Sequence, residues 1–276
     1  MTSFLDKTAL ITGAGSGIGQ ALAIALAKQG CHLALNDISE LGLKETLEKI
    51  ALLPAPQVNT RTYIFDVSNR AEFEKAVSEI ESDFTSLNFV FNNAGVALSS
   101  TAQDVKRADF EWLMGINFWG VVNGSELCLP LLKASGEGHI INISSVFGMI
   151  SIARQSSYNA AKFAVRGYTE ALAQEMALEG NTVNVSCVHP GGINTNIAQQ
   201  ARISEDEDRD ELVASFSKLA RTQPEKAAAV ILKGVKKNKR RIMVGTDAHL
   251  IHFLVRLLGA GYQPLTQWFA KRFDYI

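Results

Sequence analysis

The sequence predicts an α/β protein in which one doubly wound parallel sheet forms a single domain. Two observations predict it: short apolar runs rich in β-branched residues alternate with longer helical stretches, and a glycine-rich turn joins the first such run to the first helix. Runs that are apolar throughout indicate strands buried on both faces, as in parallel sheets. The strand-like runs are 7–12, 32–36, 88–92, 139–144 and 182–188, and the helical stretches include 20–29, 69–83, 103–132 and 156–179.

The glycine-rich turn follows the first strand-like run directly. It reads Gly13, Ala14, Gly15, Ser16, Gly17, Ile18 and Gly19. Beyond Gly19 the apolar residues Leu22, Ala25 and Leu26 recur at helical spacing, so the turn opens a helix. Backbone N–H groups and the positive end of the helix dipole at such a turn form a site for an anion such as a pyrophosphate.

An acidic residue, Asp37, follows the second strand-like run. A carboxylate at this point, a little over twenty residues past the glycines, matches the group that binds the ribose in dinucleotide-binding folds. The glycine turn alone could serve only a tight connection. With the helix, the second strand and Asp37 added, the sequence predicts a dinucleotide site.

Tyr158 and Lys162 are four residues apart, and Ser145 lies thirteen residues before Tyr158. If residues 156–179 form a helix, the phenol and the ammonium lie about one turn apart on one face. A fixed positive charge favours the phenolate, so we expect Lys162 to lower the pKa of Tyr158 from its reference of about 10. The bare spacing also fits a solvated helix face, and the surrounding motifs decide for proton transfer.

All these candidate groups fall just past a predicted strand. The carboxyl ends of parallel strands meet at one edge of a sheet, and ligands bind there. We therefore expect a single edge to collect the following residues: Gly13, Asp37, Asp66, Asn93, Ser145 and Gly191.

From about residue 7 to residue 195, the chain resembles the short-chain dehydrogenase/reductase family, in its form of about 250 residues. Thr12 with Gly13, Gly17 and Gly19 is similar to that family's cofactor signature. Further matches are Asp66 and Val67 at the adenine; Asn92, Asn93, Ala94 and Gly95 of the strand-four signature; and Pro190, Gly191, Gly192, Ile193 and Thr195 of the loop beside the nicotinamide. The resemblance implies a Rossmann-type fold and an enzyme that binds a nicotinamide dinucleotide.

The resemblance also implies roles for four catalytic residues: Asn117, Ser145, Tyr158 and Lys162. A hydride would pass between the nicotinamide and a substrate carbonyl carbon, while Tyr158 exchanges a proton with the oxygen and Ser145 fixes it. Lys162 would lower the Tyr158 pKa and hold the nicotinamide ribose, and Asn117 would anchor a water. Without the resemblance, Asn117 could merely hydrogen-bond a helix break, and Ser145 could cap the next segment.

The charge at Asp37 predicts NAD as the cofactor. NADP carries a phosphate where NAD has a ribose hydroxyl, and two unit charges about 4 Å apart repel by about 4 kcal/mol at an effective dielectric of about 20. The basic residue that NADP-preferring relatives carry in the glycine loop is absent, because that position is Ser16.

Several mostly apolar residues beside the matched motifs are candidates to contact substrate, together with Ser145 and Tyr158. They are Val96, Phe147, Met149, Gln155 and Ile193, and they favour a lipophilic alcohol or ketone. The segment 193–221 occupies the position of a substrate lid. Its acidic run, 204–211, is typical of a solvated face.

The C-terminal part differs in charge from the rest of the chain. From Lys226 onward there are ten basic and two acidic residues, a net charge of +8, so the first 225 residues carry −9. We expect a dehydrogenase domain over 1–246 and a basic amphipathic extension over 247–276. The extension carries Leu250, Leu254, Leu257 and Leu258 on one helical face, followed by Trp268, Phe269, Lys271 and Arg272. It suits an anionic membrane surface or a phosphorylated substrate such as an acyl-CoA, or it packs on the domain or on a neighbouring subunit.

Composition narrows the remaining classes. The chain has 276 residues and a formal net charge of −1, and its three cysteines and five histidines show no metal-ligand spacing. We expect a cytoplasmic homodimer or homotetramer acting on a small-molecule alcohol or ketone, with no metal and no nucleic acid. Two other functions stay open: an NADPH-linked acyl or polyketide ketoreductase, which Asp37 and Ser16 disfavour, and a non-catalytic dinucleotide sensor, which the intact catalytic residues disfavour.

Overall fold

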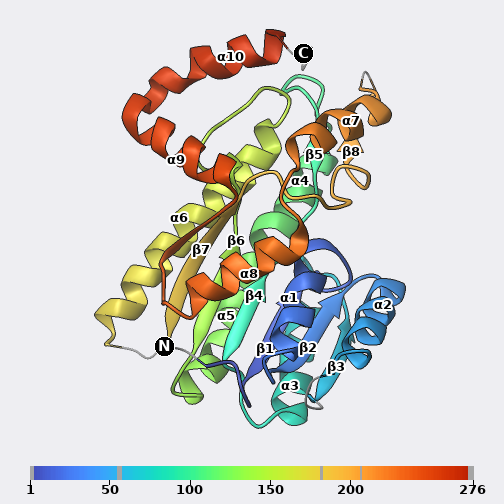
Figure 1. Cartoon of the computed structure of the whole chain (residues 1–276), viewed down its shortest axis with the longest axis vertical. Helices are drawn as coiled ribbons and strands as arrows, with labels where there is room; N and C mark the ends of the chain where they lie inside the picture. The colour runs from blue at the N-terminus through green and yellow to red at the C-terminus, as the bar shows by residue number, and fades with distance from the viewer. Residues whose placement is uncertain (1–2, 55–57, 181–182, 206, 273–276) are drawn as a thin grey trace.

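The computed structural model describes residues 3–54, 58–180, 183–205 and 207–272. Its centre is a sheet of seven parallel strands in the order β3-β2-β1-β4-β6-β7-β9 (Figure 1). The strands are β1 (Thr8–Thr12), β2 (His32–Asp37), β3 (Thr60–Ile64), β4 (Phe89–Asn92), β6 (His139–Ile143), β7 (Asn184–Pro190) and β9 (Arg241–Val244). The chain runs outward from β1 to β3 and then returns to β4 on the other side of β1, so the switch point lies between β1 and β4. The predicted doubly wound parallel sheet is confirmed.

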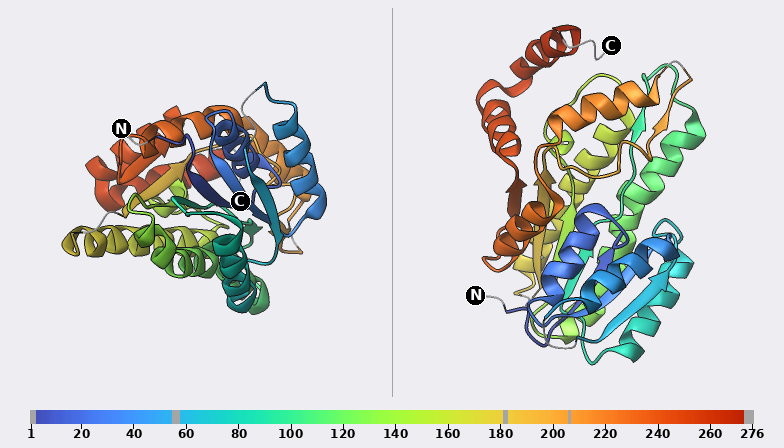
Figure 2. Two further views of the ribbon diagram at one scale, coloured as in Figure 1. Left: turned by 90° about the horizontal axis from the view of Figure 1, so that it is seen from below. Right: turned by 45° about the vertical axis from the view of Figure 1, so that its right-hand side comes forward.

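Helices cover both faces of this sheet (Figure 2). The helices that precede the C-terminal segment are α1 (Gly17–Ala27), α2 (Glu40–Ala51), α3 (Arg70–Asp83), α4 (Arg107–Met114), α5 (Gly120–Ala134), α6 (Ser156–Leu178), α7 (Arg209–Leu219) and α8 (Pro224–Val235). Side chains alternate along a strand, so Ile11 of β1 packs into the core under α1 and α8, whereas Leu10 packs into the core under α3, α5 and α6. Burial on both faces explains why the central strands are apolar throughout.

The helical stretch predicted over 103–132 is interrupted in the structure. It consists of α4, one π-helical turn (Gly115–Trp119) and α5, and it begins at Arg107 rather than at residue 103. The Thr101 hydroxyl accepts a hydrogen bond from the Asp104 N–H (3.2 Å), which closes a turn before the helix. The π turn contains Asn117, and π turns of this kind are frequent at functional sites.

Two edge strands, β3 and β9, have no residue range among the predicted strands, although a strand was expected just before Asp66. β3 exposes most of its residues, and β9 begins at Arg241 within a basic segment. Edge strands often carry polar and charged residues, so their apolar signal is weak. For β7, the predicted start at Thr182 lies outside the described residues.

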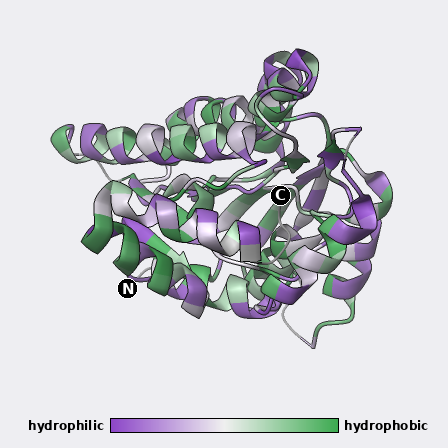
Figure 3. Cartoon of the chain, turned by 90° about the horizontal axis from the view of Figure 1, so that it is seen from above, coloured by the Kyte–Doolittle hydropathy of each residue, from purple (hydrophilic) through white to green (hydrophobic). Residues whose placement is uncertain are grey.

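The chain ends in a segment that we call the C-terminal arm, residues 246–272. It comprises α9 (Thr246–Leu258), a 3-10 turn (Gly259–Tyr262) and α10 (Gln263–Arg272). The arm stands above the carboxyl edge of the sheet, and Figure 3 looks down on the molecule from that side. Residues 273–276 of the predicted extension lie outside the described part of the chain.

The basic residues of segment 233–241 lie away from this arm. They run from the last turn of α8 to the first residue of β9, at the amino edge of the sheet (Figure 1). There the Lys236 ammonium donates a hydrogen bond to Gln29 (2.5 Å) and lies 5.2 Å from the centre of the Phe4 ring. The charge and the amphipathic helix that are adjacent in the sequence therefore occupy opposite ends of the sheet.

We predict that the buried His139 makes stability depend on pH. Its ring lies 2.8 Å from the Ser186 hydroxyl, and burial lowers its pKa to about 4. Because the folded pKa lies below the unfolded value of about 6.5, the unfolded state binds more protons in this window, and stability falls as pH drops from about 6.5 to about 4. The full effect is about 3 kcal/mol. Urea unfolding should show a smaller loss of stability between pH 7 and pH 5 for His139→Gln than for the wild type. The exposed His249→Gln is the control, and an unchanged loss in His139→Gln contradicts the prediction.

Candidate active site

The candidate residues lie together at the carboxyl edge of the sheet. The glycine turn follows β1, Asp37 ends β2, Asn93 follows β4, Ser145 follows β6 and Gly191 follows β7. Asp66 stands two residues beyond the end of β3. Since all seven strands run parallel, the expected convergence at one edge is confirmed.

The glycine turn approaches the end of β4 too closely for side chains. A Cβ atom at Gly13 would lie 2.8 Å from the Cα of Ala94, and one at Gly19 would overlap the carbonyl oxygen of Gly13. At Gly17, which has φ +52°, the methyl group of Thr195 lies against the space that a side chain would fill. At these glycines no side chain covers the main chain of the turn. The loop after β7 lies directly beside the turn.

Asn93 and Thr12 hold the turn in this position. The Asn93 amide nitrogen donates to the carbonyls of Thr12 (2.9 Å) and Gly13 (3.2 Å). In return, the Thr12 hydroxyl accepts from the N–H groups of Asn93 and Ala94, both at 3.0 Å. These reciprocal bonds explain why Thr12 and Asn93 accompany the glycines.

The Asp37 carboxylate is fixed beside the turn. One oxygen accepts from the Gly15 N–H (2.8 Å) and the other from the Ser39 N–H (2.9 Å). Gly15 has no room for a Cβ, because Asp37 and the main chain of Gly42 lie against it. A negative charge thus stands at the rim of the cradle, and Ser16 at the start of α1 makes no capping bond with its side chain.

At the adenine side of the predicted cofactor site, Asp66 and Val67 belong to a tight turn. Asp66 accepts from both the N–H and the hydroxyl of Ser68, each at 2.8 Å. Val67 is buried, and its carbonyl accepts from the Asn123 side chain (3.0 Å). Asp66 stays partly exposed and is available to a ligand.

Asp247, which the sequence reasoning missed, holds the loop after β7. Its carboxylate accepts from the Gly192 N–H (2.7 Å), and it occupies the space that a side chain at Gly191 would need. Asp247 lies in the first turn of α9, so the C-terminal arm begins on the loop that the resemblance places beside the nicotinamide. In the sequence it appears only as one acid among many bases.

Ser145, Tyr158 and Lys162 come together between the end of β6 and the first turns of α6. The Tyr158 and Ser145 side chains share a hydrogen bond. The Lys162 ammonium donates to the Ile143 carbonyl (3.1 Å) and lies 5.6 Å from the centre of the Tyr158 ring. The Ser144 hydroxyl also donates to the Lys162 carbonyl (2.8 Å), so the lysine is fixed at both ends.

The expected lowering of the Tyr158 pKa is wrong. Burial raises the pKa of Tyr158 to about 12, and the hydrogen bond from Ser145 offsets only part of this rise. Burial also lowers the pKa of Lys162 to about 8. Desolvation disfavours each charged form, and it is the largest cause of both pKa shifts.

The Asn117 side chain is bonded at both of its polar ends to the main chain of Val96. Its amide nitrogen donates to the Val96 carbonyl (2.9 Å), and its oxygen accepts from the Val96 N–H (2.8 Å). Near it, the space beside Gly95 is bounded by the Asn117 amide oxygen and the Lys162 ammonium. Asn117 thus joins the π turn to the loop after β4, and its expected role with a water stays a prediction.

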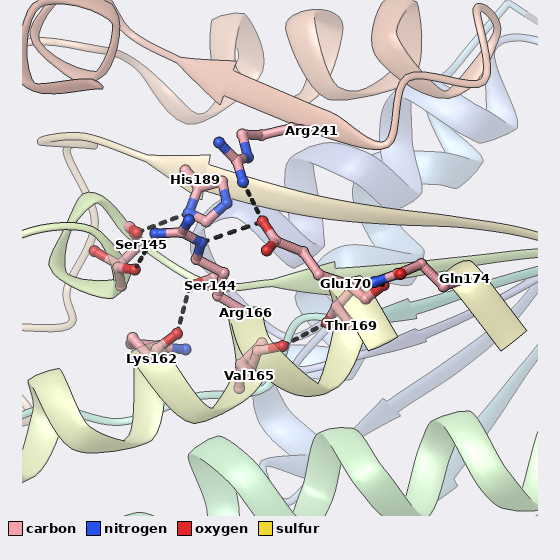
Figure 4. Close-up of polar contacts among 11 residues, drawn as sticks. Ser144, Ser145, Lys162, Val165, Arg166, Thr169, Glu170, Gln174, His189 and Arg241 are labelled. Carbon is pink, nitrogen blue, oxygen red and sulfur yellow. Dashed lines mark hydrogen bonds and ion pairs between the residues drawn. The ribbon is translucent and has the colours of Figure 1, made fainter. Parts of the chain in front are cut away.

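Two further residues without a place in the predicted site, His189 and Asn159, hold the loop that follows β6. The His189 ring lies fully buried beside β6, and its Nδ1 donates to the Ser145 carbonyl at 3.0 Å (Figure 4). Its Nε2 has no partner in the described part of the chain. Asn159 donates to the carbonyls of Phe147 and Ile150, both at 2.8 Å.

Only some of the predicted substrate residues lie beside Tyr158. The Phe147 ring stands edge-on to Tyr158 with the ring centres 6.1 Å apart, and Val96 packs in the same small apolar cluster as Tyr158. Met149 and Ile193 are buried, and Ile193 belongs to the core under α1 and α8. Gln155 bridges to Ser100 beside the first turn of α6.

Part of the acidic run fastens the segment 193–221 to the domain. Two short strands, β5 (Leu98–Ser99) and β8 (Arg202–Ile203), pair beside the run. Glu207 accepts from Arg154 (2.5 Å) and from Ser99 (2.8 Å) in a mostly buried position, while the exposed Glu205 pairs with Lys106 (2.9 Å). The solvated-face interpretation is therefore wrong for Glu207. Asp206 lies outside the described residues.

Comparisons with known proteins agree with this geometry. The family model described as short chain dehydrogenase matches residues 7–206. The chain is 44% identical over 266 residues to a Mycobacterium tuberculosis protein, SadH, that bears the provisional name of an oxidoreductase; the match covers 96% of this chain and 95% of that protein. The protein belongs to the short-chain dehydrogenase/reductase family.

Solved structures of the family have the same fold. A Burkholderia phymatum short-chain dehydrogenase/reductase in complex with NAD superimposes with a TM-score of 0.83 at 28% identity, covering 93% of this chain and 96% of that one. For the crystal structure of levodione reductase the TM-score is 0.79 at 30% identity, covering 90% and 99%. The Leifsonia aquatica levodione reductase is 35% identical over 201 residues, 72% of this chain and 74% of that protein.

The residues at the carboxyl edge fit the nicotinamide dinucleotide that this family uses. The bare glycine main chain at the start of α1 suits a pyrophosphate, and Asp37 suits a ribose. Within the described residues, no cluster of three histidine, cysteine or acidic side chains could hold a metal ion.

We predict that Asp247 is required for tight dinucleotide binding. Asp247→Ala removes the acceptor for the Gly192 N–H and should weaken dinucleotide binding about tenfold, because a hydrogen bond to a charged group contributes about 1.5–3 kcal/mol. Asp247→Asn keeps an acceptor of the same shape and should retain most of the affinity. Calorimetric titration checks both variants, with Asp210→Ala on the exposed start of α7 as the control. Wild-type affinity in Asp247→Ala contradicts the prediction.

Proposed function

We propose that this oxidoreductase is NAD-dependent and interconverts a secondary alcohol and a ketone. The observation that carries the proposal is the placement of the hydrogen-bonded pair Ser145 and Tyr158, with Lys162, on the same sheet edge as the glycine cradle and Asp37. A bound nicotinamide supplies or accepts the hydride at its C4 atom. The chain itself supplies orientation and the proton.

In the direction of ketone reduction, Tyr158 acts as the acid. With its pKa raised, the phenol is protonated at neutral pH and can donate its proton to the oxygen that becomes the alcohol. Ser145 donates a hydrogen bond to that oxygen and orients it. The His189 bond to the Ser145 carbonyl fixes the serine main chain, so the hydroxyl that meets substrate is held from behind.

In the direction of alcohol oxidation, the proton moves the other way and Tyr158 must be a phenolate. Lys162 promotes this form while it carries its own charge, and its pKa of about 8 keeps most of it charged at neutral pH. An oxidised nicotinamide would bring a second positive charge to the site when it binds. Burial therefore raises the pKa of Tyr158, whereas these two cations would lower it.

The substrate that we propose is a lipophilic ketone or alcohol. Phe147 and Val96 present apolar surface at the Tyr158 ring, and Met149 supports the same loop from the core. A relative named for the reduction of a dione supports a carbonyl substrate. We further propose that segment 193–221 acts as the substrate lid, since the Arg154–Glu207 ion pair joins it to the loop before α6.

Exposed aromatic residues on the α5 and α6 side support a homo-oligomer. Trp119 at the start of α5 and Phe163 on α6 are both exposed to solvent. Large apolar side chains on neighbouring helices are typical of subunit contacts. We infer a homodimer or homotetramer formed through this side.

We predict that Tyr158→Phe abolishes turnover without loss of dinucleotide binding. A screen of NADH formation or consumption over secondary alcohols, steroids, hydroxyacyl thioesters and diketones first identifies a substrate. With it, the variant should lose a factor of about 10²–10⁴ in kcat, because the acid is gone while the ring remains. Tyr168→Phe, on the same helix but outside the site, should keep its activity. Substantial turnover by Tyr158→Phe would sink the proposed role.

We predict a preference for NADH over NADPH, at least tenfold in kcat/KM. The Asp37 carboxylate repels a 2′-phosphate, and no described lysine or arginine is bonded to it. Asp37→Asn removes the charge at constant size. It should lower the KM for NADPH and so reduce the ratio of kcat/KM for NADH to kcat/KM for NADPH. Glu40→Gln, in the first turn of α2, is the control. A wild-type KM for NADPH equal to or below that for NADH refutes the preference.

A further inference from the structure

The C-terminal arm exposes large apolar side chains on both of its helices. On α9, Leu250, Phe253 and Leu257 are 59%, 62% and 68% exposed, and their spacing places them on one side of the helix. On α10, Leu265 and Trp268 are 39% and 57% exposed, and together with the three α9 residues they make up what we call the outer face of the arm. The Phe269 side chain lies outside the description.

The charges of the arm all have one sign. From Ala248 to Arg272 the sequence contains no aspartate and no glutamate. The ionisable side chains in this range are His249, His252, Arg256, Lys271 and Arg272, with a tyrosine at 262. Asp247, at the root of the arm, is engaged with the Gly192 N–H. The arm therefore offers apolar and cationic groups together and no acid.

The arm is fixed to the domain at its root and at its bend. The first part of α9 contacts β9 and the 3-10 turn after Ser145, Val146–Gly148. At the bend, the Tyr262 hydroxyl accepts a hydrogen bond from the Ser151 N–H (3.0 Å). Residues Ile251, Leu254 and Val255 are partly buried on the inner side of α9. The outer face thus has a defined orientation while its leucines and Phe253 remain in water.

We propose that this face of the C-terminal arm binds an anionic membrane surface, with α9 and α10 lying along the bilayer. Leucine, phenylalanine and tryptophan side chains insert at the boundary between headgroups and acyl chains, and nearby cations attract acidic headgroups. Within the described residues, no helix is long and apolar enough to cross a membrane. The contact is therefore peripheral.

Charge favours a lipid surface over a second copy of the arm. In a symmetric dimer formed through this face, the same patch contacts itself, so the cations of one arm would meet the cations of the other. An anionic bilayer instead neutralises them. The composition of the arm, apolar with positive charge alone, is complementary to acidic lipid.

Vesicle flotation of the full-length protein tests the proposal. We expect it to float with phosphatidylcholine vesicles that contain about 30% phosphatidylglycerol and to float weakly with pure phosphatidylcholine, with the bound fraction falling at high salt. Phe253→Glu combined with Leu257→Glu should reduce the bound fraction at least tenfold. Leu178→Glu, at a leucine that is 88% exposed at the end of α6, is the matched control and should bind like the wild type.

Two further measurements keep the test decisive. Arg256→Gln with Lys271→Gln leaves the apolar face intact and should lower binding to the acidic vesicles several-fold, even if the glutamate variant fails to fold. Light scattering reports the oligomeric mass of each variant. Equal flotation of wild type and both arm variants overturns the proposal. So does a loss of oligomeric mass in Phe253→Glu/Leu257→Glu with unchanged flotation, which would make the face an interface between copies.

A truncation after residue 246 would be a poorer test. It removes Asp247 and Tyr262, which hold the Gly192 and Ser151 main chains beside the site. The point variants leave both anchors in place. Dinucleotide binding should therefore stay at the wild-type level in every arm variant, so a failure of the membrane proposal is distinguishable from a failure of the proposed enzymatic function.

Discussion

The close approach of the glycine turn to the end of β4 is the constraint on which the rest of the site depends. Gly13 lies against the Ala94 main chain, and Asn93 bonds back to the carbonyls of Thr12 and Gly13. This contact joins the cradle for the dinucleotide to the strand whose next loop leads to Val96 and Asn117. A side chain at Gly13 would push the two strand ends apart and separate the cradle from the catalytic side of the sheet.

From that contact a series of bonds between side chains and main chain reaches the candidate catalytic residues. Val96 is held by both ends of the Asn117 amide, and the Asn117 oxygen and the Lys162 ammonium border the same space beside Gly95. Lys162 is tied to β6 through the Ile143 carbonyl. The Ile143 carbonyl gives the buried ammonium one acceptor, and burial lowers the lysine pKa to about 8 while it raises that of Tyr158 to about 12. The pair is protonated on the phenol and charged on the amine near neutral pH, which is the state required for giving a proton to a carbonyl oxygen.

The sequence predicted the central strands, the helix that carries Tyr158 and Lys162, and the gathering of candidate residues at one edge, because burial on two faces and helical spacing leave strong patterns. It did not predict β3 or β9, whose edge positions tolerate charge, nor the π turn at Asn117, which follows from main-chain bonding. Asp247 and His189 act on main-chain atoms of distant residues, so no local pattern marks them. The expected lowering of the Tyr158 pKa was wrong, because the spacing of Tyr158 and Lys162 indicates that a charge is near but does not indicate that burial removes water from both groups.

The C terminus shows how charge counted along a sequence can mislead about a surface. Lys236 lies over Phe4 and donates a hydrogen bond to Gln29 at the amino edge of the sheet. It therefore contacts the N-terminal part of the domain and lies far from the arm. What remains on the arm is a smaller positive charge with exposed apolar side chains, and Tyr262 and Asp247 attach the arm to the domain. Both anchors end on loops that border the site, Ser151 before α6 and Gly192 after β7. The arm cannot shift as a unit without breaking one of these bonds, so the orientation of its exposed face and the position of the two loops are fixed by the same contacts.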